Sequence, residues 1–310
     1  MKAYTSNNIR NIAVLGHGGK GKTTLCEAML YIAGASDRLG RVADGNTVLD
    51  FDSEEKRRKS SVSSAIAALE WDNTKLNIID APGLFDFEGG AAEAVRAAEA
   101  VLIVTSAGSG VDVGTEKAFR AAEKKGAAKF FAVTKTDSDH RNFYKTFDAL
   151  KEVYGNKLCP TIIPYMEGNI TKCYVNLMTG MAFSYDENGK ATKVPVPEDS
   201  VIEEMTSAFM EAVATTDDAL MEKFFEGEKF TKEEILKGLC IGIFDGSIYP
   251  VYAVSGLTCA GVDQLLYGLA WSAPGAFGYA GEKCTYENGE EGILPCDENG
   301  PLAAVCFKTI

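Results

Sequence analysis

The sequence lacks any long hydrophobic run. Its longest apolar stretches, such as AVLIV at residues 100–104, are far too short to span a bilayer. The first ten residues contain no apolar core of signal-peptide length. Basic residues are outnumbered by acidic ones, and the net charge of -13 argues against a broad basic surface for nucleic acid or anionic membrane. We therefore expect a cytoplasmic monomer that binds neither membrane nor DNA.

Paired cysteines are also missing. The eight cysteines include no C-x-x-C pair, so we expect reduced thiols that are mostly buried as small hydrophobic groups. Cys284, Cys296 and Cys306 could supply metal ligands, but their spacing matches no zinc template. Histidine is scarce, with only His17 and His140, and the second is expected at the surface.

Short apolar runs alternate with amphipathic stretches along much of the chain. This alternation predicts an α/β fold with a mostly parallel sheet and helices on both faces. Ligands of such sheets bind beyond the carboxyl ends of the strands. The predicted strands are 11–16, 75–80, 100–107, 129–135 and 249–255, and the clearest helices are 114–126 and 261–271.

The interval between residues 137 and 255 is too long for one strand–helix–strand unit, which needs about 30 residues. Residues 174–196 look like antiparallel strands, with a two-residue hairpin turn at Asn188-Gly189. A helical region follows from 198 to 225, and TKEE at 231–234 opens another helix with a capping box. We therefore predict a small α+β insert mounted on the core.

The last residues are expected to belong to another unit. Residues 281–300 are linker-like, whereas 301–310 are typical of a strand without a partner, which suggests that the natural protein continues. The predicted organisation is a first part of the core at 1–157, the insert at 158–247, the last core strand and helix at 248–280, and a linker plus first strand of a further domain at 281–310.

The stretch GHGGKGKTTL at residues 16–25 contains the phosphate-binding pattern G-x-x-x-x-G-K-T after an apolar strand. Gly16 and Gly21 let the backbone turn its N–H groups toward phosphates. Lys22 would reach the β- and γ-phosphates, and Thr23 would hold Mg²⁺. The alternative is a glycine-rich turn without a ligand. The predicted phosphate-binding residues are Gly16, His17, Gly18, Gly19, Lys20, Gly21, Lys22, Thr23 and Thr24.

Three further motifs follow predicted strands. Asp80 ends a strand and could reach Mg²⁺ through a water, with Gly83 in the turn that follows. In TKTD, Asp137 could accept hydrogen bonds from guanine while the stem of Lys135 covers the ring. SGL could offer a backbone N–H to the guanine carbonyl. These motifs predict a GTPase, with base contacts from Thr134, Lys135, Asp137, Ser255, Gly256 and Leu257.

Taken together, the P-loop with His17, NIIDAPGLFDFEGG, TKTD and AVSGLTCAGVDQLL resemble translational GTPases, and most specifically elongation factor G and its paralogues. The insert resembles the subdomain of elongation factor G through DDALMEKFFEGEKFTKEEILKGL, and the final PLAAVCFKTI resembles the first strand of the following β-barrel domain. The resemblance implies binding of GTP and GDP with Mg²⁺, action on the ribosome and a role in protein synthesis.

The first switch departs from the family pattern. SEEKRRKSSVSSAIAALEW at 53–71 stands where the family usually has R-G-I-T, with Lys59 at the Gly and Ser61 at the metal-binding Thr. Serine retains the hydroxyl that coordinates Mg²⁺ but lacks the methyl that helps order the loop. This run favours an elongation-factor-G-like paralogue. A solvated charged loop, ordered only by the γ-phosphate, is the alternative.

Other departures concern binding. Thr134 replaces the usual Asn of N-K-x-D, which removes an amide that braces the base and the P-loop, so we expect weaker binding with guanine still preferred. Gly19 and Lys20 replace the family's usual P-loop residues, and Lys20 adds a charge near the phosphates without an assigned role.

The most serious departure is Leu84, which stands at the position of the family's catalytic His. Leucine can neither donate nor accept a hydrogen bond, so it cannot orient the attacking water. We predict intact GTP binding with slow hydrolysis, with Lys22 retained and His17 and Asp86 as substitute candidates. A GTP-sensing binding module is the main alternative. A partitioning-class ATPase is disfavoured because that class needs Lys at the position of His17.

Overall fold

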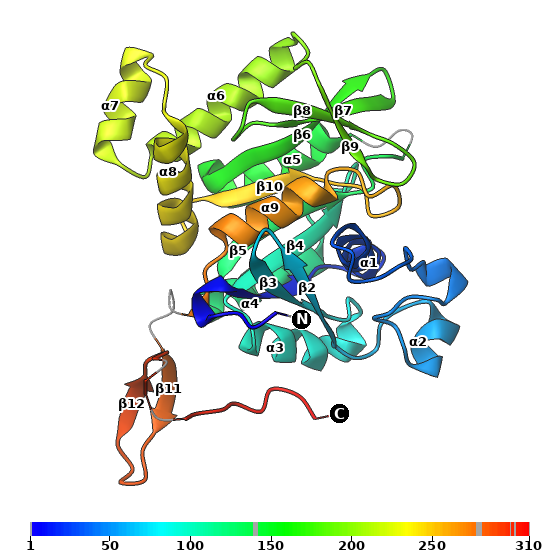
Figure 1. The fold of residues 1–310 in the computed structure, drawn as a ribbon, viewed down its shortest axis with the longest axis vertical. Coiled ribbons are helices and arrows are strands. Elements are labelled where there is room, and N and C mark those ends of the chain that lie inside the picture. The colour runs from blue at the N-terminus through cyan, green and yellow to red at the C-terminus, as the bar shows by residue number, and fades with distance from the viewer. Residues whose placement is uncertain (1, 139–141, 277–280, 298, 301, 310) are drawn as a thin grey trace.

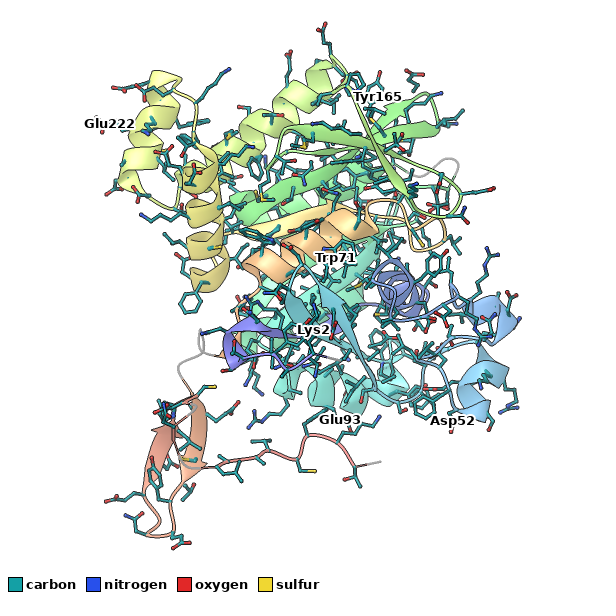
Figure 2. All side chains as sticks on the ribbon, viewed as in Figure 1. Lys2, Asp52, Trp71, Glu93, Tyr165 and Glu222 are labelled. Carbon is teal, nitrogen blue, oxygen red and sulfur yellow. The ribbon has the colours of Figure 1, made fainter. Side chains whose placement is uncertain are left out.

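A computed structural model describes residues 2–138, 142–276, 281–297, 299–300 and 302–309. A single ten-stranded sheet crosses the molecule, with helices on both of its faces (Figure 1). Side chains fill the space between the layers (Figure 2), and Trp71 packs edge-on against Tyr267 with their rings 5.4 Å apart. Within the described residues, no helix combines the length and apolar character needed to cross a bilayer.

The sheet has the strand order β2-β3-β1-β4-β5-β10-β6-β7-β8-β9. The six strands from β3 to β6 in this order run parallel, whereas β2 and β7 to β9 are antiparallel to their neighbours. This confirms the predicted mostly parallel sheet. The strands are β1 (Ile9–Leu15), β2 (Ala65–Trp71), β3 (Thr74–Asp80), β4 (Ala100–Ser106), β5 (Ala128–Thr134), β6 (Leu158–Glu167), β7 (Ile170–Asn176), β8 (Met181–Tyr185), β9 (Ala191–Val194) and β10 (Tyr249–Ala253).

The helices cover the two faces in separate groups. One face carries α1 and α9, which contact each other and β3, with α8 beside them; the other carries α3, α4 and α5 (Figure 1). The helices are α1 (Lys22–Ile32), α2 (Ser53–Arg58), α3 (Glu88–Arg96), α4 (Val113–Lys125), α5 (Phe143–Tyr154), α6 (Ser200–Ala214), α7 (Asp218–Glu226), α8 (Lys232–Asp245) and α9 (Val262–Ser272).

The core is densest in the middle of the sheet. Every residue of β4, β5 and β10 is buried, as expected for parallel strands that are covered on both faces. Neighbouring β1 has β3 on one side and β4 on the other. The chain therefore leaves β1 at a topological switch point, where open α/β sheets bind their ligands.

The insert is part of the main sheet and not a separate layer, because β6 pairs in parallel with β10 and β7 to β9 extend the same sheet. The antiparallel strands predicted within 174–196 and the TKEE capping box on α8 are confirmed. The boundaries proposed for the insert stay predictions.

The hairpin turn between β8 and β9 is longer than predicted. A two-residue turn of Asn188 and Gly189 would need positive φ at both, but only Gly189, at +75°, has it. Instead the Asp186 carboxylate accepts hydrogen bonds from the N–H groups of Asn188 and Lys190, both at 2.9 Å. This side-chain turn widens the loop, and its Gly189 packs closely against Cys259 and Ile32 of the core.

The C-terminal part contains a hairpin where a linker was expected. Two short antiparallel strands, β11 (Glu282–Thr285) and β12 (Glu291–Leu294), form this hairpin, which protrudes below the sheet (Figure 1). The strand expected at 301–310 stays a prediction. An extended segment becomes a strand only by pairing with another, and this one pairs with none of the described strands.

Candidate nucleotide-binding site

The P-loop lies between β1 and α1, at the carboxyl edge of the sheet. Gly21 precedes α1 with φ +87°, a left-handed conformation that glycine adopts without steric cost. The Lys22 ammonium is buried and donates to the carbonyls of Gly16 and His17, both at 3.1 Å. Burial lowers the pKa of Lys22, while the nearby Asp80 carboxylate works against that shift. The loop is therefore closed around one lysine at the positive end of a helix.

The turn after β3 presses directly on the P-loop. A Cβ on Gly83 would lie 2.2 Å from Lys22 Nζ and 2.8 Å from Gly18 N. Only glycine permits this approach, so Gly83 brings the backbone of the turn after β3 against the phosphate loop.

Thr23, Ser61 and Asp80 come together although they lie on three different segments. Thr23 Oγ1 donates to Asp80 Oδ2 at 2.6 Å, and Ser61 Oγ donates to Asp50 Oδ1 at 2.7 Å. The Thr23 and Ser61 oxygens lie 3.1 Å apart. The two oxygens are within hydrogen-bond distance of each other and each also contacts a carboxylate oxygen, so four oxygens gather in an arrangement that a cation stabilises.

This donor set fits Mg²⁺. Adjacent oxygens of an octahedral Mg²⁺ shell lie about 3.0 Å apart, given bonds of roughly 2.1 Å, and the two hydroxyl oxygens have nearly that spacing. Asp80 Oδ1 and Asp50 Oδ2 are buried and have no hydrogen-bond partner among the described residues, so they are open to metal-bound waters. Burial raises the pKa of Asp80 to about 7, against the opposing effect of Lys22. A cation here would restore the charged form of Asp80.

Lys20 has a partner that the sequence did not reveal. Its ammonium lies 3.1 Å from Asp112 Oδ2, at the start of α4. Asp112 also caps that helix, because its Oδ1 accepts from Thr115 N at 2.9 Å. Although burial works in the opposite direction, hydrogen bonds from Thr115 and Lys20 lower the pKa of Asp112. Lys20 therefore ties the P-loop to α4, which gives it a structural contact.

The TKTD segment braces the P-loop from the other side. Thr134 Oγ1 donates to Lys20 O at 2.6 Å and to Thr105 O at 3.0 Å. Lys135 Nζ donates to Gly19 O at 2.7 Å. The expectation that Thr134 loses the brace to the P-loop is wrong, because the threonine side chain reaches the Lys20 carbonyl and donates a hydrogen bond to it.

The side of the site that is predicted to hold the base combines the loops that follow β5 and β10. Asp137 follows β5 and is exposed, so its carboxylate is accessible to a ligand. The loop of Ser255, Gly256 and Leu257 follows β10, and a Cβ on Gly256 would lie 3.0 Å from the Thr24 carbonyl. Ser255 is buried and its hydroxyl accepts from Thr258 N at 3.2 Å, which closes the loop, whereas Leu257 is exposed. The guanine motifs thus lie beside the P-loop.

An apolar side chain, Leu84, stands at the position that the resemblance predicts to be catalytic. Leu84 is 40% exposed, and its Cδ2 lies 3.1 Å from where a Cβ on Gly18 would be. Beside it, a cavity of about 460 Å³ extends between α3 and α4 and is lined by Leu84, Phe85 and Gly16, among others. Leu84 therefore covers the P-loop with a hydrocarbon side chain.

The substitute candidates are placed differently. The His17 ring packs edge-on against Phe85 at 5.6 Å, and its Nδ1 lies 3.9 Å from Asp112 Oδ1, on the side of α4. Asp86 is exposed in the turn η3 (Phe85–Phe87). His140 lies outside the described residues.

Sequence reasoning missed four buried or half-buried acidic residues around this site. Asp50, Asp112, Glu27 and Glu55 have no motif of their own, and their partners are distant in sequence or are backbone amides. The one available signal was their position: Asp50 and Glu55 lie in the first-switch region, and Glu27 lies four residues after Thr23 on α1.

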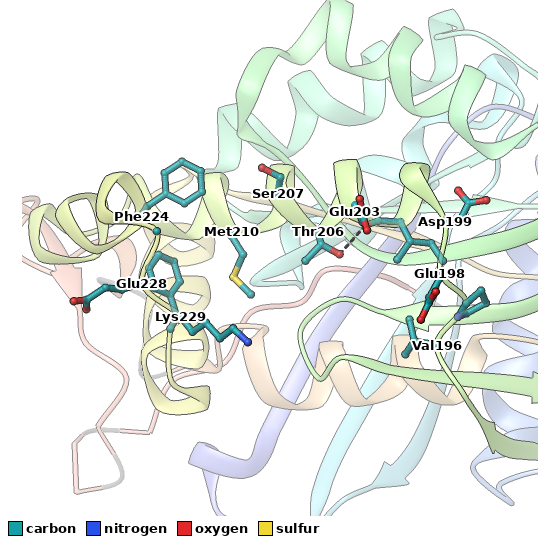
Figure 3. Close-up of a pocket in the computed structure, with 14 residues that line it drawn as sticks. Val196, Glu198, Asp199, Glu203, Thr206, Ser207, Met210, Phe224, Glu228 and Lys229 are labelled. Carbon is teal, nitrogen blue, oxygen red and sulfur yellow. Dashed lines mark hydrogen bonds between the residues drawn. The ribbon is translucent and has the colours of Figure 1, made fainter.

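One sizeable cavity is remote from these residues. About 700 Å³ in volume, it lies within the insert between Val196 and Phe230 and contains none of the predicted site residues (Figure 3). The site is therefore defined by its polar contacts and not by the size of a cavity.

Comparison with known proteins agrees with this geometry. Residues 7–274 match the elongation factor Tu GTP binding domain family. Elongation factor G-like proteins from two strains of Mycobacterium tuberculosis, CDC 1551 / Oshkosh and ATCC 25618 / H37Rv, are each 32% identical over 305 residues, which is 97% of this chain and 42% of theirs. A Thermus thermophilus protein of known crystal structure is 34% identical with a TM-score of 0.82, and the match covers 89% of this chain and 42% of that one.

The chain thus spans less than half the length of these relatives. The family match nevertheless covers the P-loop, Asp80, TKTD and SGL in one continuous range. The chain therefore belongs to the elongation factor Tu GTP binding domain family, and it is similar to elongation factor G-like proteins over nearly its whole length.

Proposed function

We propose that this chain is the GTP-binding domain of a translation factor that binds GTP with Mg²⁺ in the cytoplasm and hydrolyses it on the ribosome. The observation that carries the proposal is the pair of hydroxyls of Thr23 and Ser61, 3.1 Å apart and each in contact with a carboxylate oxygen, beside Lys22. Such a pair is suited to Mg²⁺ and lies at the sheet edge where the P-loop begins.

Each residue then has a role toward the nucleotide. Lys22 and the P-loop amides bind the phosphates, while Thr23 and Ser61 ligate Mg²⁺ and Asp80 holds one of its waters. Bound Mg²⁺ neutralises charge on the β- and γ-phosphates. Asp137 selects guanine, with Lys135 and the loop of Ser255, Gly256 and Leu257 enclosing the base.

The proposed hydrolysis is slow without the ribosome, because Leu84 cannot position water. Phosphoryl transfer depends mainly on positioning and electrostatics. Loss of a positioned acid–base group costs about 10²–10⁴-fold in rate. The phosphate and metal residues are present, so binding is retained while turnover falls.

A second candidate is a GTP-sensing module that hydrolyses little or no GTP. It is favoured by the apolar cover that Leu84 forms over Gly18. In this case the protein would change partners according to the bound nucleotide and not according to turnover.

The deciding experiment measures GTP hydrolysis by the full-length protein with and without ribosomes, beside Leu84→His. Strong stimulation of the unmodified protein by ribosomes would support the proposed GTPase and remove the sensor. Tight GTP binding without turnover, with activity gained only in Leu84→His, would establish the sensor instead.

Nucleotide choice needs a separate competition titration. Unlabelled GTP is expected to displace a bound fluorescent guanine nucleotide, whereas ATP is not. Equal displacement by both would contradict the roles of Asp137 and the 255–257 loop. Asp137→Ala is the matching variant, since it should lose the preference while leaving the phosphate contacts in place.

A further inference from the structure

Two buried glutamates outside the predicted site use the same hydrogen-bonding arrangement. Glu27 on α1 is fully buried, and its Oε1 accepts from the N–H groups of Val48 at 2.8 Å and Leu49 at 3.0 Å. Glu55 on α2 is 1% exposed, and its Oε1 accepts from Val62 and Ser63 at 3.0 and 3.2 Å. A buried carboxylate is costly unless hydrogen bonds satisfy it, so each glutamate fixes two consecutive amides.

These four amides lie near the two ends of the segment 48–63, which contains Ser61. Thr23 and Glu27 are four residues apart on α1 and therefore lie on the same helix face. Thr23 contacts Ser61 near one end of the segment, and Glu27 holds its other end. One face of the P-loop helix thus binds both ends of the first switch.

The backbone around Glu27 is shaped for this contact. A Cβ on Gly40 would lie 2.0 Å from Glu27 Oε2 and 2.9 Å from the Cα of Thr47. Only a residue without a side chain lets the loop close over the carboxylate at this point. Leu49, held by Glu27, is buried in the core and directly precedes Asp50.

The second glutamate closes the segment on itself. Glu55 Oε2 accepts from Asp52 N at 3.3 Å, as part of the capping box of α2, while its Oε1 reaches across to Val62 and Ser63. The two residues that follow Ser61 are therefore tied to α2. Asp50 directly follows Leu49, whose amide is held by Glu27, and its carboxylate accepts a hydrogen bond from the Ser61 hydroxyl.

We propose that Glu27 and Glu55 are positioning residues for the first switch, whose carboxylates fix the amides at both ends of residues 48–63 and so hold Ser61 against Thr23. The role toward Mg²⁺ rests on the proposed function, whereas the hold on the four amides does not. Ordering a backbone segment is costly in conformational entropy. Because the two carboxylates fix these amides, fewer backbone residues remain for Mg²⁺ and GTP to order.

The first test is amide hydrogen exchange on the whole protein without nucleotide. The amides of Val48, Leu49, Val62 and Ser63 are expected to be protected. Glu55→Ala should lose protection at residues 62 and 63, whereas Glu55→Gln should keep it because an amide oxygen still accepts. Glu54→Ala is the matched control, since the carboxylate of the neighbouring, half-exposed Glu54 contacts Arg57 and Arg58. Protection that persists in Glu55→Ala would overturn the proposal.

The other end is tested without removing a hydrogen-bonding group. Gly40→Ala should push against Glu27 and release the amides of residues 48 and 49 while the rest of the protein stays folded. Gly40→Ala also tests the role of Glu27 if the variant Glu27→Ala does not fold. Unchanged protection at both amides in Gly40→Ala would contradict the role of Glu27.

The second measurement is GTP affinity as a function of Mg²⁺ concentration. Glu55→Ala and Gly40→Ala should raise the half-saturating Mg²⁺ concentration about tenfold, as expected when one or two backbone residues must be ordered again. A purely structural role would lower the melting temperature without moving this midpoint, and that result would overturn the proposal. A protein that binds no GTP at all would contradict the proposed function, while hydrogen exchange would still decide whether the four amides are held.

Discussion

Two segments beside the P-loop, residues 48–63 and the turn after Asp80, are built in opposite ways. The first, which contains the beginning of the first switch, is held by buried carboxylates, and its Ser61 is hydrogen-bonded and buried. The second follows Asp80 and presents Leu84 and Phe85, which are 40% and 44% exposed. The metal side of the site is thus preorganised by polar contacts, while the side that should position water is apolar. The proposed binding and the proposed hydrolysis therefore depend on different segments of this fold.

The largest expected effect comes from giving the second switch a polar side chain. Leu84→His should raise GTP hydrolysis by about 10²–10⁴-fold, because an imidazole can orient water beside the P-loop. Single-turnover hydrolysis with the nucleotide pre-bound isolates this step from binding. Leu84→Met is the control, since it keeps an apolar side chain of similar size. No gain in Leu84→His would mean that other residues govern the water.

The next largest effect is expected from removing the hydroxyl of Ser61 in the first switch. Ser61→Ala removes one hydroxyl oxygen of the proposed metal pair, and affinity for GTP in Mg²⁺ should fall about 10–100-fold, as when groups that support a metal are lost. Affinity in excess chelator should be unchanged. Ser61→Thr restores the family's residue and should bind at least as well as the wild type. Equal loss with and without Mg²⁺ would show that Ser61 acts on loop structure alone.

A smaller change tests strain in the first switch. Lys59 ends α2 with φ +53°, at the position where the family pattern has glycine. A left-handed conformation costs a non-glycine residue roughly 1–2 kcal/mol, so Lys59→Gly should raise the free energy of unfolding by about 1 kcal/mol after the entropic cost of glycine. Urea denaturation measures it. Lys56→Gly, inside α2, should have the opposite sign; a decrease in both would show that Lys59 is unstrained.

The smallest expected effect is on the pH dependence of stability, to which Glu54 and Glu27 contribute in opposite ways. Hydrogen bonds from Arg57 and Arg58 lower the pKa of Glu54 from 4.5 to about 2, so its stabilising effect is present above pH 4.5 and is lost as pH falls toward 2. Burial raises the pKa of Glu27, so its contribution to stability decreases as pH rises above 4.5. Denaturation of Glu54→Gln from pH 2 to 7 should approach the wild type only in acid. A constant difference would mean that the pair with the arginines is unimportant.

The sequence predicted the core strands because each is a short apolar run before a recognisable motif. It missed β6, whose Pro160 and Pro164 argue against a central strand. Pro160 lies at a register shift in the pairing with β10, beside Val251, and Pro164 lies in the part of β6 that pairs with β7. It also missed β2, because the charged residues of the first switch directly precede that strand and the whole run was interpreted as a loop.

The site was predictable where chemistry is carried by local motifs and not where it depends on distant contacts. Thr23 follows from the P-loop pattern and Asp80 from its place at a strand end after that loop, whereas Leu84 follows from the family resemblance. The clamp of Glu27 on the amides of Val48 and Leu49 joins residues about twenty positions apart, and no periodicity reports such a contact. The brace from Thr134 to Lys20 is likewise a matter of side-chain reach.

The pairing of β6 with β10 has a consequence for shortening this protein. Removing residues 158–247 to obtain a minimal GTPase would strip β10 of its outer neighbour and leave its buried edge open to solvent. It would also delete Tyr174, whose hydroxyl lies 2.7 Å from that of Thr136 in TKTD. Open edges of apolar strands pair with other chains. Such a deletion variant would be prone to aggregation, so the insert has become indispensable to the domain that carries it.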